Sequence, residues 1–208
     1  MIDYSYVECS MATLTGLSEF HEEFPDYRKD EILNAIKRGC NFMKRIQRKD
    51  GSWYGSWACC FCYGAWFGVE GLVAAGESVD CLEIKKCCDF LLTHQRENGG
   101  WGEDFTSCYD KDYAENGMKS YGDQGSGVVN TAWALLALSA AKCENVDAVK
   151  KGVRYLMERQ LPSGDWPQEG IAGVFNRACG ITYTAYRNVF PLWALGRCSE
   201  VYGKSLDS

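Results

Sequence analysis

The sequence predicts an all-α protein in which paired inner and outer helices form a partial α/α barrel. Three observations predict it: a Gln–Gly–Trp pattern recurs at one spacing, an amphipathic segment precedes each Gln, and a much more apolar segment follows each Trp. Alternating amphipathic and apolar helices are typical of two concentric layers, in which the inner helices form the wall of a central space.

The repeated pattern is a Gln, a Gly four residues later and a Trp six residues later, and we call each copy a QW motif. A Gln at a helix end can hydrogen-bond backbone groups of neighbouring helix termini, while the Trp ring packs over the junction. An amide and an indole cannot act as acid, base or nucleophile near neutral pH, so we interpret the motifs as structural. The copies are Gln47/Gly51/Trp53, Gln95/Gly99/Trp101 and Gln160/Gly164/Trp166.

The individual helices follow from the spacing of apolar residues. Residues 7–20 (VECSMATLTGLSEF) predict a first helix of the inner type. An outer helix is predicted before each Gln. In each copy three apolar residues are separated by four and then three positions, and the Gln follows four positions later, so all of them share one helix face. These residues are Ile36, Cys40 and Met43, then Ile84, Cys88 and Leu91, then Val149, Val153 and Leu156. Inner helices are predicted over 57–75, 128–141 and 179–195.

Residues 57–76 approach the length and apolarity of a membrane span. Glu70 and several glycines interrupt this stretch, with Gly64 and Gly68 at GxxxG spacing. The other segments also need a partner for their apolar faces. We therefore interpret the stretch as a helix that is buried on all sides within a helical protein.

Composition limits the classes of function. The 208 residues are 46% hydrophobic and 24% charged, which is typical of one globular domain or a tightly packed part of one. With a net charge of -6 and basic residues scattered among acids, the chain is not expected to bind nucleic acid. Twelve cysteines lie mostly in apolar helical patterns beside only two histidines, so we expect reduced, buried thiols, no metal site and a reducing compartment.

No GxSxG, Walker, HExxH or Gly-rich dinucleotide motif occurs, so the candidate chemistry is aromatic. Steps of four, four, three, four and three residues place one set on a single predicted helix face: Phe175, Cys179, Tyr183, Tyr186, Phe190 and Trp193. Such a stripe can be core packing. It can also line an apolar cavity, where each ring face would stabilise a cation by about 1 to 2 kcal/mol.

A carboxylate pair offers a competing site. Glu103 and Asp104 could serve a carbohydrate-cleaving α/α barrel. Adjacent residues rarely flank a substrate from both sides, however, and these two begin a polar loop, 102–127, that we expect at the surface.

Four stretches of the sequence are distinctive: YVEC (6–9), DGSWYGSW (50–57), GGWGEDF (99–105) and GDWPQEGIAGVFNRACGITYTAYRNVFPLWALGR (164–197). They resemble the oxidosqualene cyclases, and most closely those of the lanosterol synthase type. The QW repeats are shared with bacterial squalene-hopene cyclases. Because the similarity covers nearly the whole chain, residues 1–208 are expected to form the C-terminal part of the catalytic α/α-barrel domain.

The resemblance implies an isomerase that protonates 2,3-oxidosqualene and cyclises it through carbocations to lanosterol or a related triterpene, with no cofactor or metal. Its partners would be the substrate, the remainder of the cyclase chain and a membrane surface. The expected location is the endoplasmic reticulum membrane or a lipid droplet. Which triterpene forms is not predicted.

The resemblance also assigns roles to individual residues. Trp57 and Tyr63 match cavity aromatics, and Cys9 matches a cysteine that hydrogen-bonds the catalytic Asp and keeps it a strong proton donor. Further cavity positions are Phe175, Asn176, Cys179, Tyr183 and Tyr186. The family's D-C-T-A-E motif, which carries the acid, does not occur in this sequence. We therefore expect a fragment that is inactive alone, and the alternative is a non-catalytic helical interaction module.

Overall fold

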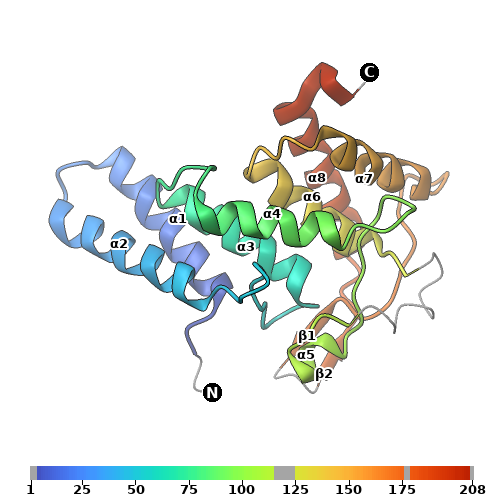
Figure 1. Ribbon diagram of the computed structural model, residues 1–208, viewed down its shortest axis with the longest axis horizontal. Helices are drawn as coiled ribbons and strands as arrows, with labels where there is room; N and C mark the ends of the chain where they lie inside the picture. The colour runs from blue at the N-terminus through green and yellow to red at the C-terminus, as the bar shows by residue number, and fades with distance from the viewer. Residues whose placement is uncertain (1–3, 115–124, 176–178, 207–208) are drawn as a thin grey trace.

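The computed structural model describes residues 4–114, 125–175 and 179–206. The fold is helical with one short hairpin, as Figure 1 shows. The helices are α1 (Val7–Glu23), α2 (Lys29–Ile46), α3 (Phe61–Ala74), α4 (Leu82–Thr93), α5 (Ser107–Asp110), α6 (Val128–Ala140), α7 (Val146–Arg159) and α8 (Tyr186–Tyr202), followed by the 3-10 turn η2 (Gly203–Leu206). The strands are β1 (Gly173–Phe175) and β2 (Cys179–Ile181). The all-α prediction is confirmed apart from this hairpin.

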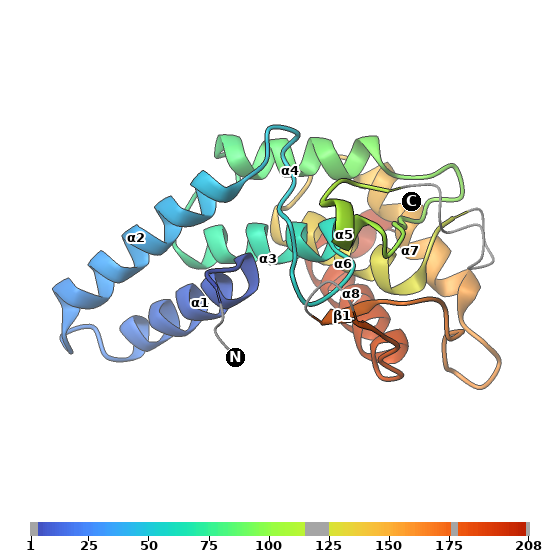
Figure 2. The ribbon, with the colours of Figure 1, turned by 90° about the horizontal axis from the view of Figure 1, so that it is seen from below.

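The longer helices lie in two layers (Figures 1 and 2). Helices α1, α3, α6 and α8 contact one another in that order, while α2, α4 and α7 pack against them from one side. Most residues of α3 and nearly every residue of α6 are buried. In α2 and α7 the buried residues lie on one face, as the spacing in the sequence predicts.

The apolar stretch 57–76 forms part of the core. Its helix, α3, has 14 residues and begins only at Phe61. Residues 57–59 are instead held beside β1, because Val174 N donates to Trp57 O (3.1 Å) and Cys59 N donates to Ala172 O (2.9 Å). In the part of the chain that the structure describes, no helix combines the length and apolarity that crossing a membrane requires.

Glycines in α3 permit close contact with the segment that carries Trp53. A Cβ on Gly64 would lie 2.1 Å from Trp53 O, and one on Gly68 would lie 2.2 Å from Trp53 Cε3. A larger side chain would therefore displace the Trp53 backbone at Gly64 and the Trp53 ring at Gly68. The GxxxG spacing serves packing within the protein.

The helix predicted over 179–195 is wrong in its first part. Residues 173–175 and 179–181 pair as antiparallel strands, with Gly173 opposite Ile181, and α8 begins only at Tyr186. The Tyr183 ring occupies the space where a Cβ on Gly173 would lie, since the Cε2 atom is 2.3 Å from that position. Phe175 and Cys179 therefore do not share a helix face with Tyr186, because hairpin pairing replaces the helical period here.

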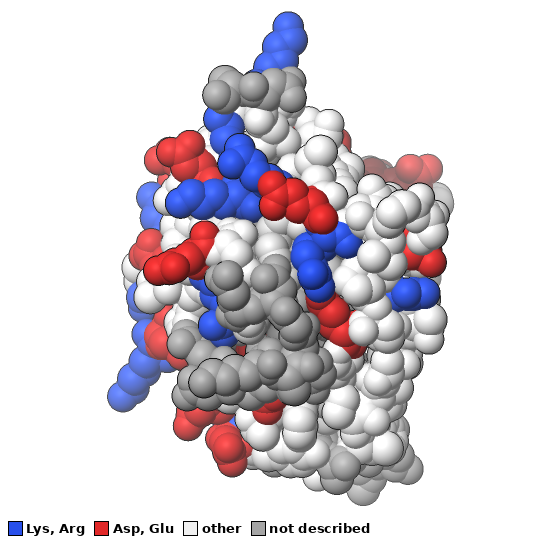
Figure 3. Space-filling model, turned by 90° about the vertical axis from the view of Figure 1, so that its right-hand side faces the viewer, with Lys and Arg blue, Asp and Glu red and all other residues white. Residues whose placement is uncertain are grey.

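Charged residues of both signs are interspersed on the face in Figure 3, which lies on the α7 side of the molecule. This mixing agrees with the modest net charge of -6. Broad single-sign fields, which steer polyanions, do not develop on a surface of this kind.

Candidate functional site

The QW motifs fix the ends of the outer helices. Each motif Trp is fully buried and donates its indole N–H to the carbonyl ten residues earlier, near the end of the preceding helix. These bonds run from Trp53 to Met43 (2.8 Å), from Trp101 to Leu91 (2.7 Å) and from Trp166 to Leu156 (2.8 Å). Each motif Gly has a φ between 85° and 91°, a left-handed conformation that other residues rarely adopt.

The motif glutamines join consecutive outer helices. Gln47 Nε2 donates to Gly51 O (2.9 Å) and to Glu83 O in the first turn of α4 (2.7 Å). Gln95 Nε2 does the same with Gly99 O (2.9 Å) and Ala148 O in the first turn of α7 (2.8 Å). Gln160 donates to Gly164 O of its own turn (2.8 Å). The first two motifs thus tie α2 to α4 and α4 to α7.

A continuous set of aromatic rings crosses the inner helices. The Tyr63 ring of α3 lies 5.0 Å from the Trp133 ring of α6, which lies 6.0 Å from the Tyr186 ring of α8. Tyr186 continues the set to Phe190 at 4.9 Å and stacks on Tyr183 at 4.5 Å. We call these five residues the aromatic face. Trp133 was missed by the sequence analysis, although it lies in the predicted inner helix.

A second ring contact lies at the hairpin. The Trp57 ring is 5.4 Å from Phe175 in β1 and 6.3 Å from Tyr6, which precedes α1. Trp57 also lines a hollow of about 410 Å³ with Tyr4, Ser5, Tyr6, Tyr54, Ser56 and Lys111. Phe175 and Tyr183 are not among the residues that line this hollow. Asn176 lies outside the described residues.

Cys9 interacts electrostatically with Tyr63 of the aromatic face. Burial raises the pKa of the Tyr63 phenol far above its usual value, and the charges of Glu8, Tyr186, Cys9 and Tyr183 act in the same direction. These groups must therefore lie within electrostatic range of Tyr63. Cys9 and Cys179 are both exposed, and Tyr183 is 39% exposed, so all three are accessible to solvent in the described structure.

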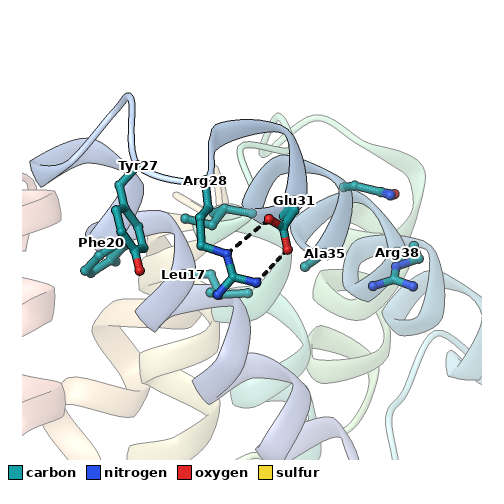
Figure 4. Close-up of a pocket in the computed structure, with 9 residues that line it drawn as sticks. Leu17, Phe20, Tyr27, Arg28, Glu31, Ala35 and Arg38 are labelled. Atoms are coloured by element: carbon teal, nitrogen blue, oxygen red, sulfur yellow. Dashed lines mark hydrogen bonds and ion pairs between the residues drawn. The ribbon is translucent and has the colours of Figure 1, made fainter.

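A larger hollow lies elsewhere, between α1 and α2 (Figure 4). It measures about 450 Å³, and its lining includes Phe20, Tyr27 and the Arg28–Glu31 ion pair (2.6 Å). Both members of this pair are more than half exposed. None of the predicted site residues lines it.

The expectation that Glu103 and Asp104 lie on an exposed loop is wrong, because both are buried. The Glu103 carboxylate accepts N–H groups of Phe61 (2.8 Å) and Cys62 (2.9 Å) at the N-terminus of α3. Burial raises the pKa of Glu103 to about 7, although these N–H groups lower it. Asp104 accepts from Thr106 N (2.9 Å) in its own turn. The two carboxylates hold different backbone segments and do not flank a common cleft.

The same arrangement recurs at α6. Glu169 accepts the N–H of Val128 at the start of that helix (2.6 Å) and pairs with Arg159 (2.7 Å). A carboxylate at a helix N-terminus satisfies free N–H groups and favours the helix dipole. The sequence analysis named Glu103 only as part of a carboxylate pair and did not name Glu169, although each acid follows a motif Trp by two or three residues, at Trp101 and Trp166.

A family model for the squalene-hopene cyclase C-terminal domain matches residues 1–200. The chain belongs to this family. It is 48% identical over 206 residues to the lanosterol synthase of Homo sapiens, covering 97% of this chain and 27% of that protein. It is 54% identical over 206 residues to the cycloartenol synthase of Dictyostelium discoideum, covering 99% of this chain and 28% of that protein.

A solved structure supports the fold of this cyclase-family chain. The type II terpene cyclase MstE from Scytonema superposes with a TM-score of 0.61 at 15% identity, covering 79% of this chain and 52% of that one. At this identity the match concerns the fold alone. The resemblance to the cyclases is confirmed, while the roles of individual site residues stay predictions. The chain spans little more than a quarter of the length of its curated relatives.

Proposed function

We propose that the chain forms part of the C-terminal barrel of an oxidosqualene cyclase and supplies one wall of its cavity. There 2,3-oxidosqualene would cyclise to lanosterol or a related triterpene, which is an isomerase reaction. Relatives at 48% and 54% identity are a lanosterol synthase and a cycloartenol synthase. In the proposed barrel, α1, α3, α6 and α8 are inner helices, the other long helices are outer ones, and the first two QW motifs join consecutive outer helices.

The aromatic face is the observation that carries the proposal. Its rings run without a break from Tyr63 through Trp133 to Tyr186, on three successive inner helices. Ring faces attract cations, and the attraction grows when water is excluded. Trp133, Tyr63 and Phe190 are buried, so Tyr183 and Tyr186 are the rings of this face that would meet the substrate, and their electrons would stabilise carbocations of the cyclisation. Trp57 and Phe175 would extend the wall at the hairpin.

The proton donor would come from outside this sequence. Cys9, an exposed residue of α1, matches the family's supporting cysteine and would hydrogen-bond that donor. A thiol that hydrogen-bonds an ionised carboxylate stabilises the charge left after proton transfer, which makes the acid stronger. The chain would therefore provide the wall and the support of the acid, and the remainder of the cyclase would provide the acid itself.

A chimera tests this proposal. The corresponding segment of the human lanosterol synthase is replaced by this chain, and products from 2,3-oxidosqualene are identified by gas chromatography and mass spectrometry. We expect a cyclised alcohol from the chimera and none from the isolated chain. Trp57→Leu should reduce turnover at least tenfold, because it removes a ring from the wall. Tyr27→Leu, which alters an exposed ring between α1 and α2, is the control and should leave turnover unchanged.

The alternative, a non-catalytic helical module, predicts a different result. A chimera that folds with a normal melting curve but yields no cyclised product would favour the module. Equal turnover of the Trp57→Leu and Tyr27→Leu chimeras would remove Trp57 from the proposed wall.

A further inference from the structure

Three cysteine sulfurs meet beside the N-terminus of α3. Cys108 Sγ in α5 lies 3.1 Å from Cys60 Sγ and 3.8 Å from Cys59 Sγ. All three residues are at most 1% exposed. Neither the aromatic face nor the QW motifs involve these thiols, so the proposed function leaves the cluster without a role.

Contacts on both sides hold Cys108 in place. Tyr54 Oη donates to Cys108 O (2.9 Å), and Glu103 binds the first N–H groups of α3 directly after Cys60. The segment carrying Cys108 is thus anchored to the segment carrying Cys60. A disulfide bond measures about 2.05 Å, so the two sulfurs need to approach by only about 1 Å to form one. The four-residue helix α5 can shift more easily than the buried helix α3.

We propose that Cys60 and Cys108 form a reversible disulfide when the chain meets a small disulfide oxidant such as glutathione disulfide. The linkage would join positions 48 residues apart and fix the α5 segment to the start of α3. It is independent of the cyclase proposal, because it concerns the thiols of this chain and no substrate.

Thiol–disulfide exchange accounts for every atom and electron of the step. The Cys108 thiolate attacks one sulfur of glutathione disulfide, whose S–S bond breaks and releases one glutathione thiolate. Cys60 gives its proton to that thiolate and attacks the Cys108 sulfur of the mixed disulfide, which releases the second glutathione. Two protein thiols lose two electrons in total, and the oxidant gains both.

Cys108 is the first attacking sulfur for an electrostatic reason. Hydrogen bonding with Cys59 and Cys60 lowers the pKa of the Cys108 thiol, whereas burial and the bond to Cys108 raise the pKa of Cys60. The oxidant reaches Cys108 when α5 opens locally, so the reaction should be slow compared with modification of the exposed Cys9 and Cys179.

Peptide mapping of the 208-residue chain tests the proposal. Exposed thiols are first removed by Cys9→Ser and Cys179→Ser, and the chain is incubated with glutathione disulfide, alkylated under denaturing conditions and digested. We expect a linked peptide joining Cys60 to Cys108 with the loss of two hydrogen atoms, and its disappearance after dithiothreitol. The melting temperature should rise by about 5 °C or more, because a long loop is closed in the unfolded state.

Matched variants assign the sulfurs. Cys59→Ala and Cys87→Ala should keep the linked peptide, since Cys87 is a fully buried cysteine of α4 outside the cluster. Cys60→Ala should abolish it. The proposal would be overturned if Cys60 and Cys108 were both still alkylated after prolonged oxidation. Glutathionylation of Cys9 in the unmodified protein would show that the oxidant had reacted. A Cys59–Cys108 linkage would also overturn the proposal. If a variant does not fold, peptide mapping of the parent chain still shows whether Cys60 and Cys108 are linked.

Discussion

Glu103 shows two opposing electrostatic effects on one residue. Its side chain is 1% exposed, which disfavours the charged carboxylate, while the N–H groups of Phe61 and Cys62 favour it. Burial is the larger effect, and it raises the pKa from 4.5 to about 7. Loss of a proton from Glu103 at neutral pH therefore costs folding free energy, although the carboxylate is well hydrogen-bonded.

This raised pKa predicts that stability falls as the pH rises from about 4.5 to about 7. The folded state holds the Glu103 proton more tightly than the unfolded state, so the slope of the unfolding free energy with pH is negative in that window. Urea unfolding measures the free energy of unfolding at pH 5 and at pH 8. Between these two pH values the parent chain should lose about 2 kcal/mol more of this free energy than Glu103→Gln loses. The exposed Glu19→Gln should keep the parent slope. If the unfolding free energy of Glu103→Gln fell with pH as steeply as that of the parent chain, a group other than Glu103 would be responsible for the pH dependence.

The residues of the site differ in how well the sequence predicts them. Tyr63 and Tyr186 lie in the aromatic face, as their positions on predicted inner helices indicate, whereas their role and that of Trp57 in a cavity stay predictions. Glu103 was misplaced, because its partner is the backbone of Phe61, 42 residues earlier, and no local pattern shows such a contact. A polar run such as 102–106 looks like a surface loop whenever the groups it binds are distant in sequence.

At the scale of elements, the QW motifs connect helices to different extents. Gln95 links α4 to α7, whereas the described bond of Gln160 stays within its own turn. We expect Gln95→Ala to lower the unfolding free energy by about 1 to 2 kcal/mol and Gln160→Ala by less than about 0.5 kcal/mol. Urea denaturation of both variants measures the difference. Equal losses would mean that the bond to Ala148 O contributes nothing beyond the motif turn.

The packing of α3 against the first QW motif gives a second prediction at this scale. An added methyl at Gly68 would lie 2.2 Å from the Trp53 ring, so Gly68→Ala should cost about 2 kcal/mol or more. Gly196 in α8 has no neighbouring atom within 4 Å of the same position, so Gly196→Ala should instead stabilise by about 0.5 to 1 kcal/mol. Thermal melts of the pair test this, and a shift of the same sign in both variants would contradict the packing.

The elements also show where periodicity misleads. The bounds of α6 were predicted to within one residue, and the outer helices end close to each motif Gln as predicted, because long apolar repeats at helical spacing rarely arise otherwise. The stretch 179–195 has the same spacing, yet its first residues form β2. Backbone contacts of Trp57 and Cys59 with 172–174 provide the edge on which this hairpin forms. Such long-range pairing overrides local propensity and cannot be predicted from a short window.

At the scale of the whole molecule, α8 has an uncovered apolar side. Val189, Leu192 and Trp193 are between 43% and 60% exposed, although α8 contacts both α6 and α7. Exposed apolar residues clustered on one helix are typical of surfaces that bind another protein segment. The human relative is almost four times as long as the part matched here, and the proposed function predicts that the remainder of a cyclase chain covers this side.

Substitutions at two residues of similar exposure test whether another segment covers α8. Leu192 is 60% exposed on α8, and Met157 is 62% exposed on the outer helix α7. In the isolated chain, both Leu192→Glu and Met157→Glu should shift the unfolding free energy by no more than about 0.5 kcal/mol, because neither side chain is buried. In the chimera, Leu192→Glu should cost about 2 kcal/mol or more, since a covered carboxylate would lose its water, while Met157→Glu should stay neutral. Melting temperatures of both variants, each in the isolated chain and in the chimera, show whether the exposed side of α8 faces the remainder of the cyclase or the solvent. If Leu192→Glu were as harmless in the chimera as in the isolated chain, α8 would not face the remainder of the cyclase, and the assignment of inner and outer layers would have to be reversed at this helix.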